Sequence, residues 1–197
     1  MKKLRLIDEK NFVLLKGKVA LEISVLELFL TEIIIENLFS NMSSNEIVAL
    51  LSSVVYQGKS SSKDEQGNLK SYNNITLDQG RDRMIEIAIK INRIQSDCEI
   101  QVAGSDDFLE QLNFGLVEVV YEWSKGTPFA ILKKMTEEQE GIIVRTIQRL
   151  DETCSNLKDA AKIIGDTVLE SKMELCSTLI RRDIVFAGSL YTKTEIV

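Results

Sequence analysis

Apolar residues recur at helical spacing along most of this chain, and polar breaks separate the periodic segments. The pattern predicts helices over residues 21–39, 44–57, 77–95 and 106–125, a short helix after Pro128, and helices over 137–164 and 167–190. Ahead of them, residues 12–15 are β-prone and run into a Lys-Gly-Lys sequence, which fits a short strand. We therefore predict an all-α fold, a bundle of about seven helices behind a short β segment.

Polar residues mark the ends of several of these segments. Ser43 and Glu46 have the spacing of a capping box at the start of the second helix, and Thr136 with Gln139 repeats it before the sixth. Residues 58–74 are rich in Ser, Lys, Asp, Gly and Asn, so we expect a mobile loop between the second and third helices.

The sixth helix carries two stripes of opposite character, and Gly165 is placed to end it. One stripe has the period of a buried helix face and consists of Ile143, Ile147, Leu150, Cys154, Leu157, Ala161 and Ile164. The other lies on a different face and consists of Arg145, Arg149, Glu152 and Asn156. Two arginines one turn apart can hold a phosphate or stack on a base, and the Asn156 amide adds hydrogen-bonding groups. A plain solvated helix face is the alternative interpretation.

The composition is that of a globular protein with an acidic balance. The chain has 197 residues, of which 44% are hydrophobic and 27% charged, and its net charge is −6. A free-standing nucleic-acid binder has a basic footprint, so any such contact must come from a few local cations or from a larger assembly. The most apolar segment, 26–35, contains two glutamates and is shorter than the about 20 residues that span a bilayer, so we expect no membrane contact.

No catalytic or metal-binding constellation emerges. Cys98, Cys154 and Cys176 have neither metal nor redox spacing, and the chain has no histidine, so we expect no metal site. Gly58-Lys59-Ser60 resembles the end of a P-loop, but that motif needs a glycine where the chain has Ser53, and we reject a nucleotide site. We therefore predict no catalytic residue, no enzymatic activity and no cofactor for this chain on its own.

Three strings in the last third of the chain carry a family resemblance. They are FGLVEVVYEWSKGTPF from Phe114, EGIIVRTIQRLDE from Glu140 and LIRRDIVFAGSLY from Leu179. They are similar to the C-terminal helical domain, the DSHCT domain, of Ski2-like DExH-box RNA helicases. LKGKVALEI, from Leu15, resembles the family's junction between a winged-helix domain and this bundle. The resemblance implies that residues 1–20 end a winged-helix region and that residues 21–197 form the DSHCT bundle.

The resemblance also implies a role for the sixth helix. In these helicases the bundle packs on two RecA-like domains and closes a channel for single-stranded RNA, and one bundle helix, the ratchet helix, faces the strand. The match puts Arg149 against the RNA bases, with Arg145 one turn earlier and Asn156 about two turns further on. Family members place a glutamate on the RNA path in an FQE motif, where this chain has Tyr56-Gln57-Gly58 and no acid. ATP and Mg²⁺ belong to the parent helicase and not to this fragment.

Within the family, VVYEWSKGTPF, RTIQRL and SKMELCSTLIRRD look closer to the cytoplasmic superkiller helicase than to the nuclear exosome-adaptor helicase. The cytoplasmic form implies a 3′-to-5′ helicase that feeds RNA to the exosome, with a TPR scaffold and WD40 subunits as partners. The nuclear paralogue is one alternative. A structural protein-interaction module that never touches RNA is another, and the acidic net charge favours it.

Overall fold

A computed structural model describes residues 1–59, 71–100, 107–182 and 185, and the regular elements within these ranges are helical. In chain order they are α1 (Leu15–Leu21), α2 (Glu27–Ile35), α3 (Ser44–Val55), α4 (Ile75–Ser96), α5 (Phe108–Gln111), the 3₁₀ turn η2 (Phe114–Leu116), α6 (Val117–Ser124), α7 (Phe129–Leu132), α8 (Glu140–Ile164) and α9 (Thr167–Ile180). This architecture confirms the all-α prediction. Ahead of α1, the β-prone segment contributes one antiparallel bridge, between Ile7 and Val13.

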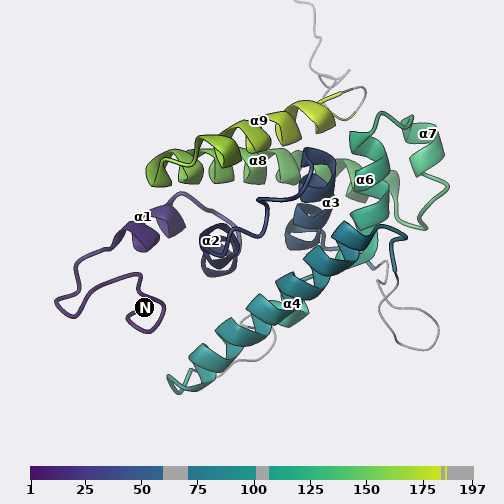
Figure 1. Cartoon of the computed structure of the whole chain (residues 1–197). Helices are drawn as coiled ribbons and strands as arrows, with labels where there is room; N and C mark the ends of the chain where they lie inside the picture. The colour runs from purple at the N-terminus through teal and green to yellow at the C-terminus, as the bar shows by residue number, and fades with distance from the viewer. Residues whose placement is uncertain (60–70, 101–106, 183–184, 186–197) are drawn as a thin grey trace, which may run out of the picture.

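Helices α8 and α9 form an antiparallel pair across one side of the molecule (Figure 1). The chain reverses at Gly165, which ends α8 as predicted; its φ of 81° is a left-handed conformation that glycine adopts without strain. Asp166 then caps α9, because its carboxylate accepts hydrogen bonds from the N–H groups of Val168 and Leu169. Helix α4 runs along the opposite side of the molecule, and α6 and α7 lie at one end.

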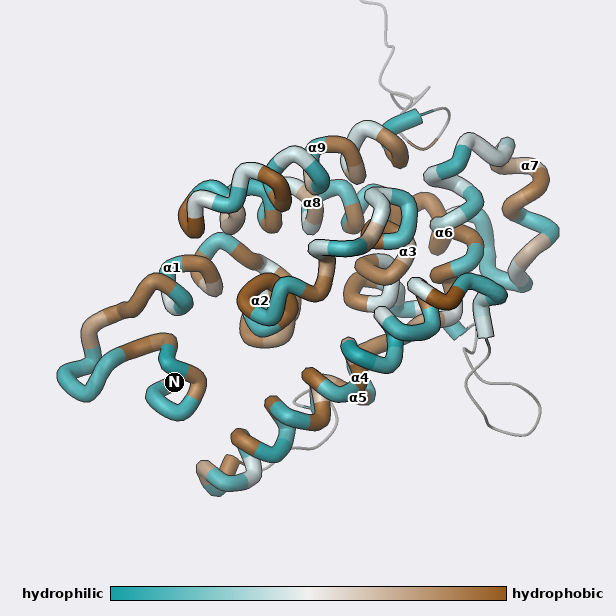
Figure 2. Tube along the Cα trace, in the orientation of Figure 1, coloured by the Kyte–Doolittle hydropathy of each residue, from teal (hydrophilic) through white to brown (hydrophobic). Residues whose placement is uncertain are grey.

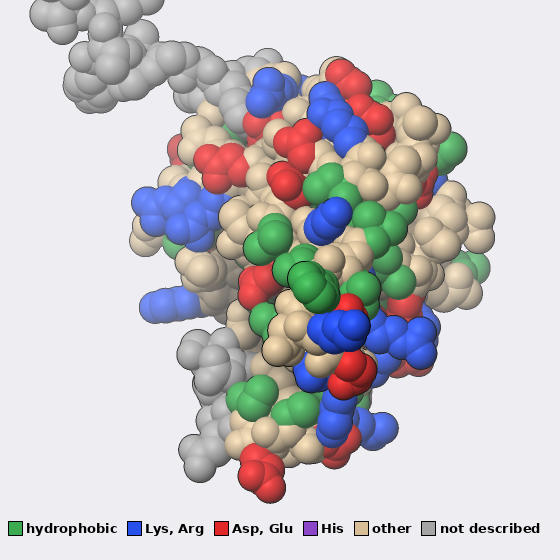
Figure 3. Space-filling model, turned by 90° about the vertical axis from the view of Figure 1, so that its left-hand side faces the viewer, with side chains coloured by type: hydrophobic (Ala, Val, Ile, Leu, Met, Phe, Trp, Pro, Cys, Tyr) green, Lys and Arg blue, Asp and Glu red, His purple; other side chains and the backbone are tan. Residues whose placement is uncertain are grey.

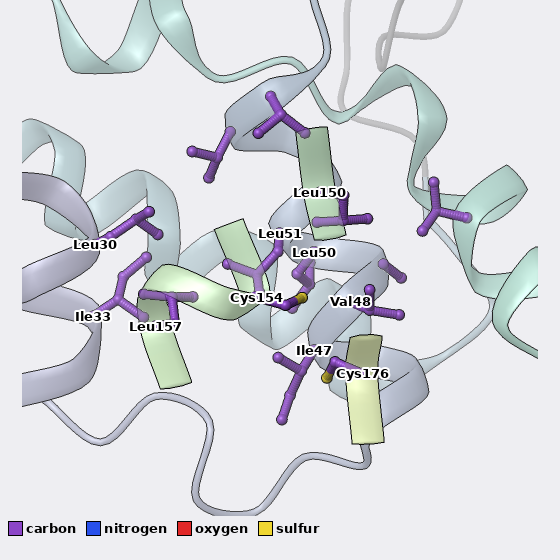
Figure 4. Packing of buried hydrophobic residues seen from close by; sticks show 14 of the residues in the cluster. Leu30, Ile33, Ile47, Val48, Leu50, Leu51, Leu150, Cys154, Leu157 and Cys176 are labelled. Atoms are coloured by element: carbon purple, nitrogen blue, oxygen red, sulfur yellow. The ribbon is translucent and has the colours of Figure 1, made fainter. Parts of the chain in front are cut away.

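Helix α3 lies in the middle of the bundle, and nearly all of its residues are buried. Its first turn has the predicted capping box: the Glu46 N–H donates to the Ser43 hydroxyl, and the Ser43 N–H donates to Glu46 Oε2 at 2.9 Å. Figure 4 shows Leu50 and Leu51 of α3 in the same cluster as Leu150 of α8. The hydrophobic core is therefore built where α3 meets the α8–α9 pair.

The predicted apolar stripe of α8 faces this core. Six of its seven members are each 0% exposed: Ile143, Ile147, Leu150, Cys154, Leu157 and Ala161. The seventh, Ile164 in the last turn, is half-buried and packs against the core. Figure 2 shows that α2 is hydrophobic over most of its surface, whereas hydrophobic and hydrophilic positions alternate along α4. Within the described residues, none of the helices combines the length and the hydrophobicity needed to cross a membrane.

The prediction of one helix over residues 21–39 is wrong. Helix α1 ends at Leu21, where the predicted helix was to begin, and α2 covers only Glu27–Ile35 of the range. Leu26, just ahead of α2, adopts a left-handed conformation with a φ of 45°. The cause lies on α8, because Asn156 Oδ1 accepts hydrogen bonds from the Ser24 N–H at 3.2 Å and from the Ser24 hydroxyl at 2.6 Å. A distant side chain thus satisfies a backbone group that a continuous helix would have used.

The predicted helix over residues 106–125 is also divided, into α5, η2 and α6. Asn113 stands at the division. Its N–H donates to the Ser53 carbonyl at 3.0 Å, its Oδ1 accepts from the Gly115 N–H at 3.0 Å, and its Nδ2 donates to the Gly58 carbonyl at 3.0 Å. An asparagine that bonds its own following backbone and the end of α3 at once favours a turn over a helix.

The helix predicted over residues 137–164 begins later than expected, at Glu140. Thr136 does not cap it. Its hydroxyl accepts a hydrogen bond from the Glu138 N–H at 3.2 Å, which makes a local turn ahead of the helix. The proposed capping box with Gln139 is therefore wrong, because Gln139 itself occupies the N-cap position.

Two further expectations fall mainly outside the described residues. The last predicted helix, 167–190, is described as α9 to Ile180, and most of the range beyond Arg182 is not described. The expected mobile loop at 58–74 falls largely on residues 60–70, which also lie outside the described ranges.

Candidate nucleic-acid interface

The second stripe of α8 lies on its open side. Arg145, Arg149 and Glu152 are exposed, whereas Asn156 is half-buried. The apolar stripe opposite fixes α8 in the bundle, so the two arginines project one turn apart from a rigid helix. Arg145 forms no hydrogen bond or ion pair with the described residues, and its guanidinium is available to a ligand.

Arg149 reaches across to the end of α3. Its Nη1 donates a hydrogen bond to Gln57 Oε1 at 2.9 Å, although the two residues are 92 positions apart in the chain. The resemblance to the FQE motif pointed to Tyr56-Gln57-Gly58 as a segment on the RNA path, but it did not single out Gln57 or predict a contact with α8. The sequence carries no local signal for that contact, because Gln57 follows the last turn of α3 and Arg149 lies on a distant helix.

Hydrogen bonds on both sides hold the segment that carries Gln57. On one side, Glu138 Oε1 accepts from the Tyr56 hydroxyl and from the Lys59 N–H, both at 2.5 Å. On the other side, Asn113 Nδ2 donates to the Gly58 carbonyl at 3.0 Å. A Cβ atom at Gly58 would lie 2.3 Å from the Tyr56 ring, so the absence of a side chain there lets this ring fold over the backbone.

Two hollows flank the Gln57–Gly58 step. A cleft of about 870 Å³ lies between residues 57–59 and the segment 134–139 that leads into α8, and Ile142 of α8 also lines it. A second hollow, of about 340 Å³, lies between the Gln57–Gly58 step, the α1–α2 connection and the turn around Asn113. Gln57 and Gly58 line both hollows and therefore form the ridge between them.

Asn156 occupies a different position from the two arginines. Its Oδ1 is taken up by Ser24, so the side chain fixes the α1–α2 connection against α8. The structure thus brings Arg145 and Arg149 together on one open face, and it gives Asn156 a contact inside the domain. The Asn156 Nδ2 group is the part of this amide that a ligand can still use.

Two of the acidic side chains beside this face make contacts within the domain. Glu138 holds the segment after α3, and Glu140 forms an ion pair with Lys133. Among the residues that the structure describes, no group of His, Cys, Asp or Glu side chains is arranged to hold a metal ion.

Two of the three cysteines lie where α8 meets α9. Cys154 and Cys176 are buried, whereas Cys98 is exposed. A hydrogen bond with the Cys176 thiol and the burial of the site raise the pKa of Cys154 well above its ordinary value. This thiol therefore stays protonated at neutral pH and is a packing residue, because nucleophilic cysteines need an accessible thiolate.

The fold and this face define a class: an all-helical bundle in which a long helix presents paired arginines beside a cleft. The DSHCT (NUC185) domain family matches residues 10–187, which is most of the chain. The chain belongs to the DSHCT domain family.

Several full-length proteins are similar to this chain. Superkiller complex protein 2 of Homo sapiens is 44% identical over 187 residues, which cover 95% of the chain and 14% of that protein. Antiviral helicase SKI2 of Saccharomyces cerevisiae is 41% identical over 193 residues, 97% of the chain and 15% of that protein. Exosome RNA helicase MTR4 of Mus musculus is 38% identical over 192 residues, 97% of the chain and 18% of that protein. The chain thus spans less than a fifth of each of these relatives.

Proposed function

We propose that this chain is the C-terminal helical domain of an ATP-dependent 3′-to-5′ RNA helicase, in which the open face of α8 lines the path of single-stranded RNA. Family membership supports the parent class, since the relatives at 41–44% identity are named as an antiviral helicase and a superkiller complex protein. The observation that carries the RNA assignment is the exposed Arg145–Arg149 pair on a helix beside an open cleft.

In the proposed mechanism α8 binds the RNA strand, and other domains bind and hydrolyse ATP. The flat Arg149 guanidinium stacks on a base or holds a phosphate, and Arg145 contacts the backbone one turn away. ATP and Mg²⁺ bind to the RecA-like domains of the parent chain, since the only P-loop-like sequence here lacks its first glycine. The bundle packs on those domains and on the winged-helix domain, and in this way it couples strand movement to their closure.

The parent enzyme then resembles the superkiller helicase more than its nuclear counterpart. Identity to the superkiller relatives is 41–44%, against 38% to mouse Exosome RNA helicase MTR4. On this basis we assign the protein to the cytoplasm, in a complex with a TPR scaffold and WD40 subunits that delivers RNA to the exosome. The nuclear exosome-adaptor helicase is the alternative within the family.

The decisive test is Arg149→Ala in the full-length helicase. Loss of a stacked arginine weakens the binding free energy of the RNA strand by about 1–3 kcal/mol. RNA unwound per ATP hydrolysed should fall, whereas ATP hydrolysis should persist because the nucleotide site lies in other domains. Arg93→Ala, which removes an exposed arginine from α4, is the matched control. Unchanged unwinding per ATP in a folded Arg149→Ala enzyme refutes the RNA assignment.

A second candidate function is a protein-interaction module without RNA contact. The net charge of −6 favours it, and so do exposed apolar side chains near the N-terminus, such as Phe12 at 68% and Leu21 at 77% exposure. Figure 3 shows hydrophobic side chains in a band across one face, between charged side chains of both signs. Photocrosslinking of RNA to the full-length helicase separates the candidates, since crosslinks to α8 are expected only if it lines the RNA path.

A further inference from the structure

We propose that Gln57 is a positioning residue of the RNA-binding face, which orients the Arg149 guanidinium without neutralising its charge. The inference rests on the proposed function, because it concerns how Arg149 is presented to single-stranded RNA. Its basis is the hydrogen bond from Arg149 Nη1 to Gln57 Oε1 at 2.9 Å.

Both ends of this hydrogen bond start from fixed backbone. Arg149 belongs to the long helix α8, whose other side is fully buried. Gln57 belongs to the short segment that Glu138 holds from one side and Asn113 from the other. An exposed arginine has many rotamers, and a ligand that needs one of them must select it. A hydrogen bond to an anchored amide restricts the guanidinium before RNA arrives.

The chemistry of the amide suits this task. A guanidinium has five N–H donors, of which Gln57 engages one, so other donors and the flat face stay available. Arg149 forms no ion pair with the described residues, and its full positive charge remains for a phosphate. A carboxylate at position 57 would hold the same group but would cancel its charge.

The location of the pair indicates what it contacts. Gln57 lines both the cleft of about 870 Å³ and the hollow of about 340 Å³, so the amide that accepts from Arg149 stands on the ridge between them. A strand that runs from one hollow to the other crosses this ridge. The ligand that fits is single-stranded RNA, with one nucleotide on either side of the guanidinium and the backbone passing over it.

Three variants of the full-length helicase test the proposal: Gln57→Ala, Gln57→Glu and Arg149→Ala. Their affinity for a single-stranded RNA is measured by fluorescence anisotropy over a range of salt concentrations. Gln57→Ala should weaken binding about fivefold and leave the salt slope unchanged, because the charge stays but its orientation is lost. Gln57→Glu should weaken binding and reduce the slope by about 0.7, the value for one phosphate contact on a single strand.

Matched controls use Gln79, an exposed glutamine on α4, as Gln79→Ala and Gln79→Glu. These variants introduce the same chemical changes away from the ridge and should match the wild type in affinity and slope. Thermal melting reports folding in each case. If Gln57 were merely structural, both of its variants would lower the melting temperature, and the salt slope of Gln57→Glu would stay at the wild-type value.

The double variant Gln57→Ala with Arg149→Ala completes the design. If Gln57 acts through Arg149, the double variant binds as weakly as Arg149→Ala alone. This comparison also decides the matter if Gln57→Glu fails to fold. An Arg149→Ala enzyme with normal RNA affinity overturns the proposed function. A weakened Arg149→Ala beside unaffected Gln57 variants, or additive losses in the double variant, overturns this inference alone.

Discussion

The two sides of α8 differ in almost every physical respect. On the packed side, Leu150 and its stripe neighbours Ile147 and Cys154 are 0% exposed, and α8 contacts α1, α3 and α9. On the open side, Arg149 is exposed and makes one hydrogen bond, to a single side chain. The packed side of such a helix fixes its position in the bundle, and the open side presents its arginines to a ligand. Substitutions on the two sides should therefore separate stability from binding.

The largest effect is expected on the packed side. Leu150→Ala removes a fully buried side chain from the cluster where α8 meets α3. Packed cores relax only partly around lost atoms, so we expect a cavity to remain. Substitutions of this kind cost about 2–5 kcal/mol of unfolding free energy. Urea unfolding of this chain, followed by circular dichroism, measures the loss. A cost below about 1 kcal/mol would mean that the core between α8 and α3 is loosely packed, and the contrast between the two sides of α8 would then fail.

Sequence alone predicted the packed side well and the breaks between helices poorly. The period of the apolar stripe, the capping box at Ser43 and the stop at Gly165 are local signals, and the structure contains all three. The breaks near Ser24 and at Asn113 depend on hydrogen bonds to residues far along the chain. Local propensity cannot register such contacts, so two long helices were expected where the structure has shorter ones.

In the candidate site, too, the sequence predicted what depends on local spacing and missed what depends on contacts between helices. Helical spacing was enough to put Arg145 and Arg149 on one open face. The same spacing did not show that Asn156 is held by Ser24, or that Gln57 meets Arg149. These pairs join different helices, and only the three-dimensional arrangement brings them together.

A second prediction concerns the phenol of Tyr72, a half-buried residue ahead of α4 that packs against the hydrophobic core. Burial raises its pKa from 10.0 to about 12, although the nearby Arg81 acts in the opposite direction. Below pH 10 the phenol is neutral in both folded and unfolded chains. Between pH 10 and 12 the unfolded chain ionises while the folded chain keeps its proton, so stability falls by about 2–3 kcal/mol in all.

Tyr72→Phe removes the titrating group and keeps the ring. Urea unfolding of both proteins at several pH values from 9 to 12 isolates the contribution of Tyr72, since all other groups are shared. The difference in stability between them should shift in favour of the variant as pH rises. Parallel pH profiles for the two proteins would show that Tyr72 is solvated.

A third, smaller effect is expected for a charge on the packed side of α8. Asp151 is 7% exposed and ties α8 to α9, because it accepts from the Ser177 hydroxyl at 2.5 Å and from Arg181 Nη2 at 2.7 Å. Asp151→Asn should cost about 1–2 kcal/mol through loss of charge-assisted hydrogen bonds. The matched control is Asp159→Asn on the same helix. Its ion pair with Lys162 is about half exposed and should be worth less than about 0.5 kcal/mol. Equal losses for the two variants in urea unfolding would remove the distinction between buried and open charges.

The smallest effect on stability is expected on the open side, immediately beside the largest. Arg149 precedes Leu150 in the chain, yet Arg149→Ala should change the unfolding free energy by no more than about 0.5 kcal/mol. The lost hydrogen bond to Gln57 lies at the surface, where water replaces it, and alanine is at least as favourable in a helix as arginine. Urea unfolding of Arg149→Ala beside Leu150→Ala measures both sides of α8 in one experiment. A loss above about 1.5 kcal/mol for Arg149→Ala would show that the hydrogen bond to Gln57 helps to hold the fold. In that case any fall in RNA affinity could not be assigned to the guanidinium alone, and the open side would be structural as well.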